Sequence, residues 1–197
     1  SHELQKIDAL DYEDLRPLMD MDQISAFRKH SLNPEHPHVR GTTASSETFF
    51  QGREAGNGHY DAIPDIVQHY MDEINKLTGR NYKLFDYYGA DDAEEVVVVM
   101  GSGAETARET VDYLMSQGRK VGMISVHLFR PFSAKHFLSV LPETVKKVAV
   151  LDRTKESGAV GEPLYLDVKA VLTGSGRSFD TIVGGRFGLA AKDTTPS

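Results

Sequence analysis

Hydrophobic residues recur at two spacings along this chain, and the spacing separates expected helices from expected strands. Apolar side chains follow a helical repeat from Ile63 to Leu77, and Gly79 lies just beyond it as a candidate C-cap. Val96 to Val99 instead form an unbroken β-branched run, which is typical of a parallel strand buried on both faces. The same criteria predict helices at 105–116, 133–141 and 163–172, and strands at 82–88, 95–100, 121–128, 147–151 and 181–183.

Strands and helices alternate from residue 95 onward, which indicates right-handed crossovers and a mainly parallel sheet. Only residues 89–94 separate the first strand from the second, too few for a crossover helix, so the first strand is expected to run antiparallel. The sequence therefore predicts a three-layer α/β/α fold with a five-stranded, mostly parallel sheet. Val97 and Val99 should face one helical layer, and Val96 and Val98 the other.

The first 58 residues lack this regularity. Two short amphipathic pieces, 11–19 and 21–29, precede about thirty residues without periodicity, so we expect residues 1–58 to form an extended arm that packs on a neighbouring domain. His36 and His38 stand two residues apart with no third ligand in evidence, which favours loop residues over a metal site. The expected organisation is an arm at 1–58, an α/β domain at 59–190 and a linker at 191–197. The start without Met and the polar end suggest a piece of something longer.

Composition narrows the function classes. The formal charge of −7 opposes a general nucleic-acid role, because binding phosphates needs clustered cations. No apolar run approaches the roughly 20 residues of a membrane span, so no membrane partner is expected and the chain is interpreted as cytoplasmic. The absence of Cys excludes disulfides, thiolate zinc sites, a Cys nucleophile and Cys-ligated iron–sulfur clusters within these residues.

Charged residues and glycines gather where the parallel strands are expected to end, the edge at which open α/β sheets place ligands. This edge is either an interdomain salt-bridge surface, with Asp152 and Glu156 among the partners of Arg130 and Arg153, or a small-anion site. Its glycine turn does not complete a dinucleotide fingerprint, because the third glycine would fall at Thr106, so tight strand-to-helix packing is the simpler interpretation. No catalytic, cofactor-binding or metal-ligating set is expected. The candidate edge residues are Gly101, Ser102, Gly103, Arg130, Asp152, Arg153, Lys155, Glu156 and Arg186.

Several segments, in order along the chain, resemble the pyruvate:ferredoxin (flavodoxin) oxidoreductase family. They are FFQGREAGN, LFDYYGADDAE, LFRPFS, LDRTKE with GAVGEPLYLDV, and GGRFGL. The resemblance implies that this chain is the family's second domain, similar to the transketolase C-terminal domain. Residues 1–58 resemble the end of the preceding pyrimidine-binding domain.

The resemblance also implies the activity of the intact protein. The family is homodimeric, uses thiamine diphosphate, magnesium and [4Fe-4S] clusters, converts pyruvate and CoA to acetyl-CoA and CO2, and passes electrons to ferredoxin or flavodoxin. None of the family's cofactor or substrate residues maps onto this sequence. We therefore expect a non-catalytic domain whose partners are the other domains of the same polypeptide and the second subunit. The alternative is a free-standing small-anion or nucleotide-binding module.

Overall fold

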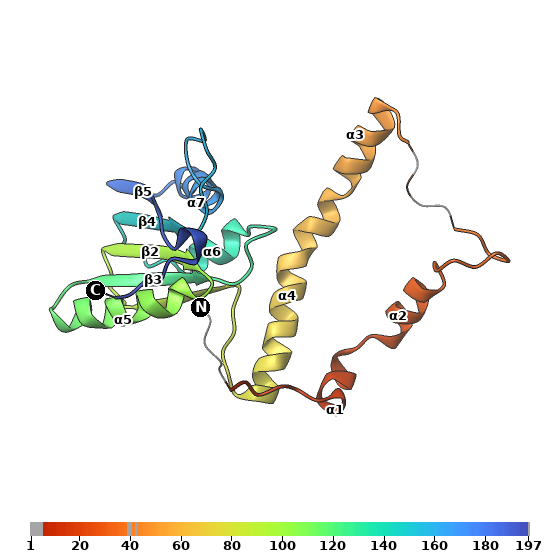
Figure 1. Cartoon of the computed structure of the whole chain (residues 1–197), viewed down its shortest axis with the longest axis horizontal. Helices are drawn as coiled ribbons and strands as arrows, with labels where there is room; N and C mark the ends of the chain where they lie inside the picture. Colours follow the sequence, from red (N-terminus) through yellow and green to blue (C-terminus); the bar gives the residue numbers. More distant parts are fainter. Residues whose placement is uncertain (1–5, 39–40, 42, 197) are drawn as a thin grey trace. The chain divides into compact units, whose positions relative to one another are not determined.

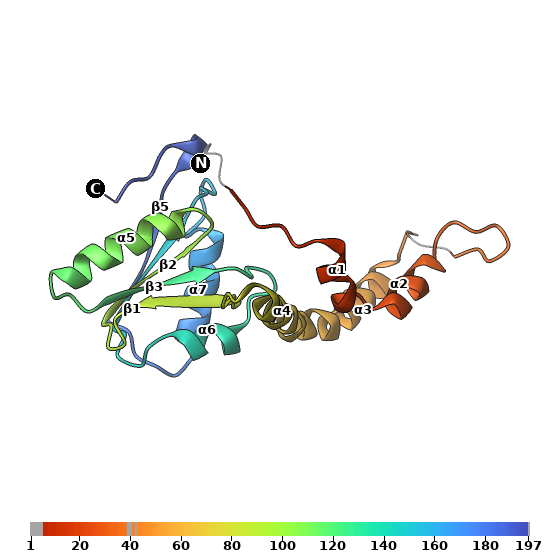
Figure 2. The ribbon, with the colours of Figure 1, turned by 90° about the horizontal axis from the view of Figure 1, so that it is seen from below.

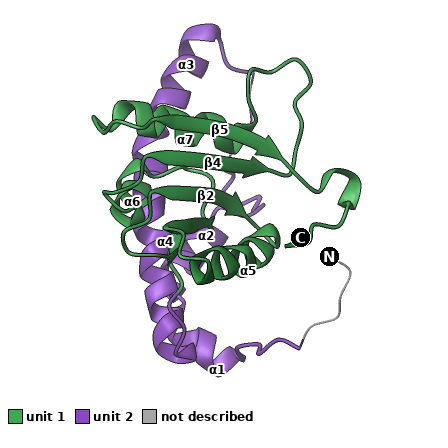
Figure 3. Ribbon diagram, turned by 90° about the vertical axis from the view of Figure 1, so that its left-hand side faces the viewer, with its two compact units in different colours: residues 1–3, 82–197 green, residues 4–81 purple. Residues whose placement is uncertain are grey.

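The computed structural model describes residues 6–38, 41 and 43–196 (Figures 1 and 2). These residues fall into two compact units that divide between Asn81 and Tyr82 (Figure 3). The expected domain boundary lay earlier, at residue 59, so the long helix expected in the α/β domain belongs to the N-terminal unit. The extent of each domain within a longer protein stays a prediction.

The C-terminal unit contains the predicted sheet. Its strands run in the order β1-β3-β2-β4-β5, with β1 antiparallel to β3 and all other pairs parallel. The predicted fold class is therefore confirmed, including the reversed first strand. The elements are β1 (Phe85–Gly89), β2 (Glu95–Met100), α5 (Gly103–Ser116), β3 (Val121–Val126), α6 (Ala134–Val140), β4 (Lys147–Asp152), α7 (Pro163–Gly174), β5 (Thr181–Arg186) and the short 3-10 turn η2 (Leu189–Ala191).

Strand β5 is longer than the sequence predicts, because glycine and polar residues at its end still pair with β4. β5 continues through Gly184 and Gly185 to Arg186, three residues beyond the expected end, because these residues pair with Val150, Leu151 and Asp152 of β4. Glycine has a low intrinsic strand preference, so composition alone ended the strand too early.

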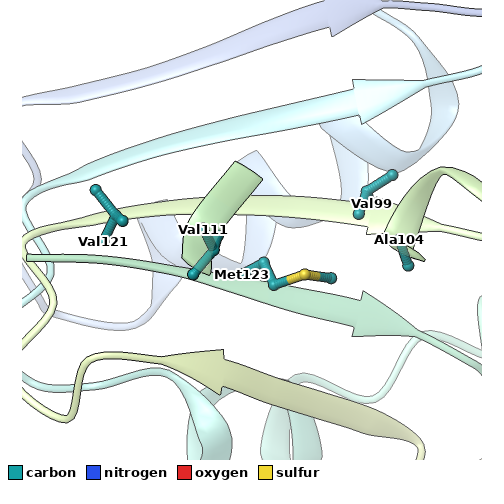
Figure 4. Packing of buried hydrophobic residues seen from close by; sticks show 5 residues of the cluster. All are labelled: Val99, Ala104, Val111, Val121 and Met123. Carbon is teal, nitrogen blue, oxygen red and sulfur yellow. The ribbon is translucent and has the colours of Figure 1, made fainter. Parts of the chain in front are cut away.

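Helices cover the sheet on both faces, but unequally. α6 and α7 pack on one face, and α5 packs on the other over β1, β3 and β2 (Figure 2). Beneath α6 and α7, Val96, Val98, Val148 and Val150 are at most 3% exposed. Under α5, a second cluster combines residues of β2, β3 and α5 (Figure 4). Its buried members are Val99, Ala104, Val111, Val121 and Met123.

The alternation of the valines in β2 agrees with the prediction, but the helical layer on the α5 face is incomplete. Val97 packs at the border of the α5 cluster and remains only partly buried. The main packing of α5 is on β1, β3 and β2, and Val183 of β5 is 49% exposed on that face. One helix is about 10 Å wide, so at a strand spacing of about 4.8 Å it cannot cover all five strands.

Truncating Val98 to Ala should lower the free energy of unfolding by about 1–3 kcal/mol, through lost burial and a residual cavity. Val98 is 0% exposed. The control is Val183→Ala, which removes the same two methyl groups from a half-exposed site and should cost clearly less. Urea denaturation measures both, and equal midpoint shifts would contradict the difference in coverage.

The N-terminal unit consists of helices. It contains α1 (Tyr12–Leu15), the 3-10 turn η1 (Arg16–Leu18), α2 (Met21–Arg28), α3 (Ser46–Ala55) and α4 (Asn57–Thr78). The helical repeat and the left-handed Gly79 at the end of α4, with φ 70°, confirm the sequence prediction there. Of the described residues in this unit, only Pro64 is buried.

Helix α3 corrects the expectation of an extended arm. Ser45 caps it by accepting a hydrogen bond from the backbone N–H of Thr48, and Glu47 in its first turn suits the helix dipole. Its two large apolar residues, Phe49 and Phe50, are adjacent rather than three or four positions apart, so a periodicity argument does not detect the helix. Of the helices in the described part of the chain, none combines the length and hydropathy that a membrane span requires.

Candidate functional site

The predicted edge residues do come together at one end of the sheet. Strands β2 to β5 are parallel, so the segments that follow them leave the same edge. Asp152 at the end of β4 lies in register with Arg186 at the end of β5. The contacts of each side chain decide whether this edge is open to a ligand.

Both carboxylate oxygens of Asp152 bind the N-terminus of helix α7. Its side chain is 1% exposed, and its two carboxylate oxygens accept hydrogen bonds from the backbone N–H groups of Leu164 and Tyr165 at 3.0 and 3.1 Å. Helix α7 begins with Pro163 and has no side-chain cap from its own N-cap residue, so a carboxylate from the neighbouring strand takes that role. The N-terminus of α7 is therefore already occupied by an anion of this chain.

Burial raises the pKa of Asp152, and the two backbone N–H groups act in the opposite direction by stabilising the carboxylate. The nearby carboxylates of Glu162 and Asp167 raise the pKa of Asp152 further. A buried, doubly hydrogen-bonded carboxylate has no lone pairs directed at solvent, so this arrangement serves the helix rather than a substrate.

Glu162 is a second buried acid at this edge, which the sequence analysis missed. It is 3% exposed, accepts a hydrogen bond from the backbone N–H of Glu156 at 2.8 Å, and forms an ion pair with the guanidinium of Arg186. The hydrogen bond from Glu156 and then the contact with Arg186 lower the pKa of Glu162. Its position directly before Pro163 at a helix start was the one available signal.

The arginines have other partners than expected. Arg130 forms an ion pair with Asp167 of α7, and its guanidinium lies 4.1 Å from the ring centroid of Phe129. Arg153 donates from Nε to the backbone carbonyl of Gly188 at 2.9 Å. The expected pairing of these arginines with Asp152 was wrong because both carboxylate oxygens of Asp152 accept hydrogen bonds from the start of α7.

Lys155 and Glu156 lie exposed in the loop after β4. The backbone of Glu156, rather than its carboxylate, contributes the contact with Glu162, and the charge of Lys155 helps to lower the pKa of Glu162. Neither expected acid, Asp152 or Glu156, is therefore the partner of Arg130.

The glycine turn after β2 packs tightly against the chain's own side chains. Gly101 adopts φ 72°, which favours glycine, and its carbonyl accepts from the N–H of Ala104. A Cβ on Gly103 would lie 2.7 Å from the ring of Phe187, so that ring occupies the space beside the start of α5. Ser102 is the N-cap of α5 and makes no side-chain capping bond. These contacts favour the packing interpretation over an anion cradle.

Metal ligation finds little support in the described residues, where no group of three His, Asp or Glu side chains could hold an ion. The ring of His38 stacks on His30 at a centroid distance of 4.6 Å. The whole sequence contains no Cys for an iron–sulfur cluster.

Comparison with known proteins places these features in a family. Residues 93–194 match the model described as pyruvate:ferredoxin oxidoreductase core domain II. Residues 1–72 match a model described as "Pyruvate flavodoxin/ferredoxin oxidoreductase, thiamine diP-bdg".

Similar proteins align along the entire chain. A pyruvate:ferredoxin oxidoreductase of Moorella thermoacetica is 57% identical over 197 residues, and a pyruvate-flavodoxin oxidoreductase of Enterobacter agglomerans is 54% identical over 197 residues. Each alignment covers 100% of this chain and 17% of the relative, so the chain spans about a sixth of the length of these proteins.

A solved 2-oxoglutarate:ferredoxin oxidoreductase from Magnetococcus marinus has a similar fold. It superposes with a TM-score of 0.55 and 16% sequence identity, covering 84% of this chain and 26% of that one. At this identity the likeness concerns the fold alone. Because the core-domain model matches more than half of the residues and the relatives align over all of them, the chain belongs to the pyruvate:ferredoxin oxidoreductase family.

Proposed function

We propose that this chain is a non-catalytic domain of a pyruvate:ferredoxin (flavodoxin) oxidoreductase and supports the neighbouring domains of that enzyme. The intact protein would convert pyruvate and CoA to acetyl-CoA and CO2 and reduce ferredoxin or flavodoxin, as a homodimer in the cytoplasm. The observation that carries this proposal is the 57% identity to the Moorella enzyme along all 197 residues.

The geometry of the edge supports a structural role. Asp152 fills the N-terminus of α7, Glu162 holds Arg186, and Phe187 covers the glycine turn before α5. Each of these contacts uses a group that a small-anion or nucleotide site would need to keep free. A calorimetric titration of the chain with CoA, ATP or thiamine diphosphate should therefore give no saturable heat in the micromolar range. A saturable response would favour the alternative function, a free-standing small-anion or nucleotide-binding module.

Thiamine diphosphate, magnesium and [4Fe-4S] clusters belong to the intact enzyme in this proposal. The sequence has no Cys, so these residues do not fit the [4Fe-4S] clusters. The parts of the polypeptide outside these residues would hold them.

The direct test uses the intact protein, purified without oxygen. Reduction of methyl viologen is measured with CoA and either pyruvate, 2-oxobutyrate or 2-oxoglutarate, and pyruvate is expected to give the highest kcat/KM. Preference for 2-oxoglutarate, or no turnover by a protein shown to contain its cofactors, would contradict the proposed substrate. The 197-residue chain alone should not reduce viologen.

Arg153→Ala in the intact enzyme should affect stability more than turnover. The change removes one exposed hydrogen bond to the carbonyl of Gly188, which contributes on the order of 1 kcal/mol. Turnover per folded dimer should stay within about threefold of the wild type, because Arg153 contacts backbone rather than a site for substrate.

The control for Arg153→Ala is Lys155→Ala, which removes a positive charge from the same exposed loop. Melting temperature, dimer content and kcat are compared for the two variants. A hundredfold fall in kcat at unchanged melting temperature and dimer content would assign Arg153 to the active site.

A further inference from the structure

The α5 face of the sheet carries an apolar groove that begins at the glycine turn of the edge, where Gly103 and Phe187 line it, and continues across β2, β4 and β5. Its floor is formed by Val97 of β2, Ala149 and Leu151 of β4, and Val183 of β5. One side is formed by α5, including Ala107, and the groove has a volume of about 470 Å³. Figure 3 shows α5 along one side of the sheet, with β4 and β5 farther from it than β2.

The groove exists because one helix covers this face where two cover the other. Parallel sheets are normally buried on both faces. On the side under α7, Val148 and Val150 of β4 are 1% and 0% exposed. On the groove side of the same strand, Ala149 and Leu151 are only partly buried, and Val183 of the edge strand β5 is 49% exposed. Leaving such a floor in water forfeits the hydrophobic stabilisation that burial would give.

Several polar side chains around the groove are already engaged within the chain. Thr110 Oγ1 donates to the carbonyl of Thr106, and Thr106 Oγ1 donates to the carbonyl of Thr194. At the opposite end, Glu95 forms ion pairs with Arg119 and Lys147. A small-molecule site normally offers a few polar groups that orient the ligand, so the apolar surface left here suits side chains of protein instead.

We propose that a segment of the same polypeptide, from outside residues 1–197, packs apolar side chains into this groove in the intact enzyme. The inference rests on the proposed function, since it requires that this chain be part of a longer protein. Most of the length of the relatives lies outside the aligned region, because the alignments cover 17% of each. A segment on the same chain also has the advantage of a high effective concentration.

The C-terminal tail supports the same occupant. After β5 and η2 the chain returns along α5, where the carbonyl of Thr194 accepts from Thr106 and both Thr194 and Thr195 line the groove. The backbone of this polypeptide thus already forms part of the groove wall.

The test uses the intact protein with the photo-crosslinking residue p-benzoylphenylalanine in place of Val183. An equal amount of isotopically labelled protein is mixed in under conditions that allow subunits to exchange. The expected product links position 183 to an unlabelled peptide of the same chain outside residues 1–197. The matched control places the same residue at Val160, which is 95% exposed in the loop before α7. A link from position 183 to labelled protein would show that a second copy fills the groove and would overturn the proposal.

Accessibility gives an independent measure. Val183→Cys and Val160→Cys are alkylated in the native intact protein, and the rates are read peptide by peptide. The exposed fractions of 49% and 95% alone would give a difference of about twofold, so a covered groove should give at least tenfold slower alkylation at position 183. A ratio near two would show an open groove. Slow alkylation without an intramolecular link would indicate a bound small molecule, and both results would overturn the proposal.

Failure here is distinct from failure of the proposed function. The crosslink and the alkylation rates are read without turnover, and the viologen assay is run on wild-type protein. Suppose that the intact enzyme oxidises pyruvate but the cysteine of Val183→Cys is alkylated freely. That result would refute only the groove inference. A protected groove in a protein inactive with pyruvate would refute only the proposed activity.

Discussion

Replacing Phe137 with Ala should lower the free energy of unfolding by about 3–5 kcal/mol, the range for deleting a buried aromatic ring. Phe137 of α6 is 0% exposed, and its ring centroid lies 5.5 Å from those of both Phe85 and Phe132. Phe85 is itself 1% exposed and stands in edge strand β1, so the deletion leaves a cavity where α6 holds that strand.

Urea denaturation of the chain, followed by near-ultraviolet circular dichroism, measures this loss. Tyr113→Ala is the matched control, since it deletes a ring that is 64% exposed on α5 and should change stability by less than about 0.5 kcal/mol. Equal effects of the two substitutions would mean that Phe137 is not enclosed between β1 and α6.

Replacing Asp152 with Ala should cost about 2–5 kcal/mol, because it leaves the backbone N–H groups of Leu164 and Tyr165 without their acceptors in a buried place. An unsatisfied buried donor costs about 1–3 kcal/mol. The first turn of α7 should open before the rest of the helix, since Pro163 and Glu162 provide no other side-chain cap.

Hydrogen exchange of Leu164 and Tyr165, together with the urea midpoint, tests the role of Asp152. Asp152→Asn is the conservative control, because its one amide oxygen can still accept a hydrogen bond and should restore part of the stability. Unchanged protection of both amides in Asp152→Ala would show that Asp152 does not cap α7.

The contribution of Asp152 should also depend on pH. Burial raises the pKa of Asp152 above its ordinary 3.8. Between the ordinary and the raised pKa, the folded protein therefore keeps a proton on Asp152 that the unfolded chain has released. Stability from this group is then greatest below the ordinary pKa and falls as pH rises towards the raised value. The side chain of Asp152→Asn does not titrate. The difference in free energy of unfolding between wild type and variant should therefore narrow as pH rises across the acid range, and then stay constant. Urea midpoints from about pH 4 to pH 7 measure it, and a difference that widens with pH would contradict the direction.

The fold was largely predictable because it is encoded by local patterns. The β-branched run at Val96–Val99, the helical repeat that ends at Gly79 and the short connection 89–94 each restrict the backbone independently. They predicted the antiparallel first strand and the parallel remainder, which the register confirms. Helix α3 was not predicted because its apolar residues do not recur at helical spacing.

The contacts of the candidate edge were not predictable, although its members were. Strand order and the carboxyl-end rule brought Asp152, Arg153 and Arg186 to one edge. Which carboxylate meets which arginine depends on the face to which each side chain points and on the helix that covers that face. The sequence therefore placed Asp152 beside Arg130 as a partner, whereas the structure turns it into α7 and leaves Arg130 with Asp167.

The sequence by itself determined the fold class and the family, because periodicity, turn residues and long matching segments are properties of the linear chain. Only the tertiary structure decided that the edge is closed by its own carboxylates and that the α5 face is left open over β4 and β5. Both depend on how far one helix extends across a five-stranded sheet and on the direction of side chains distant in sequence. These relations arise from packing in three dimensions, and no local pattern in the sequence reports them.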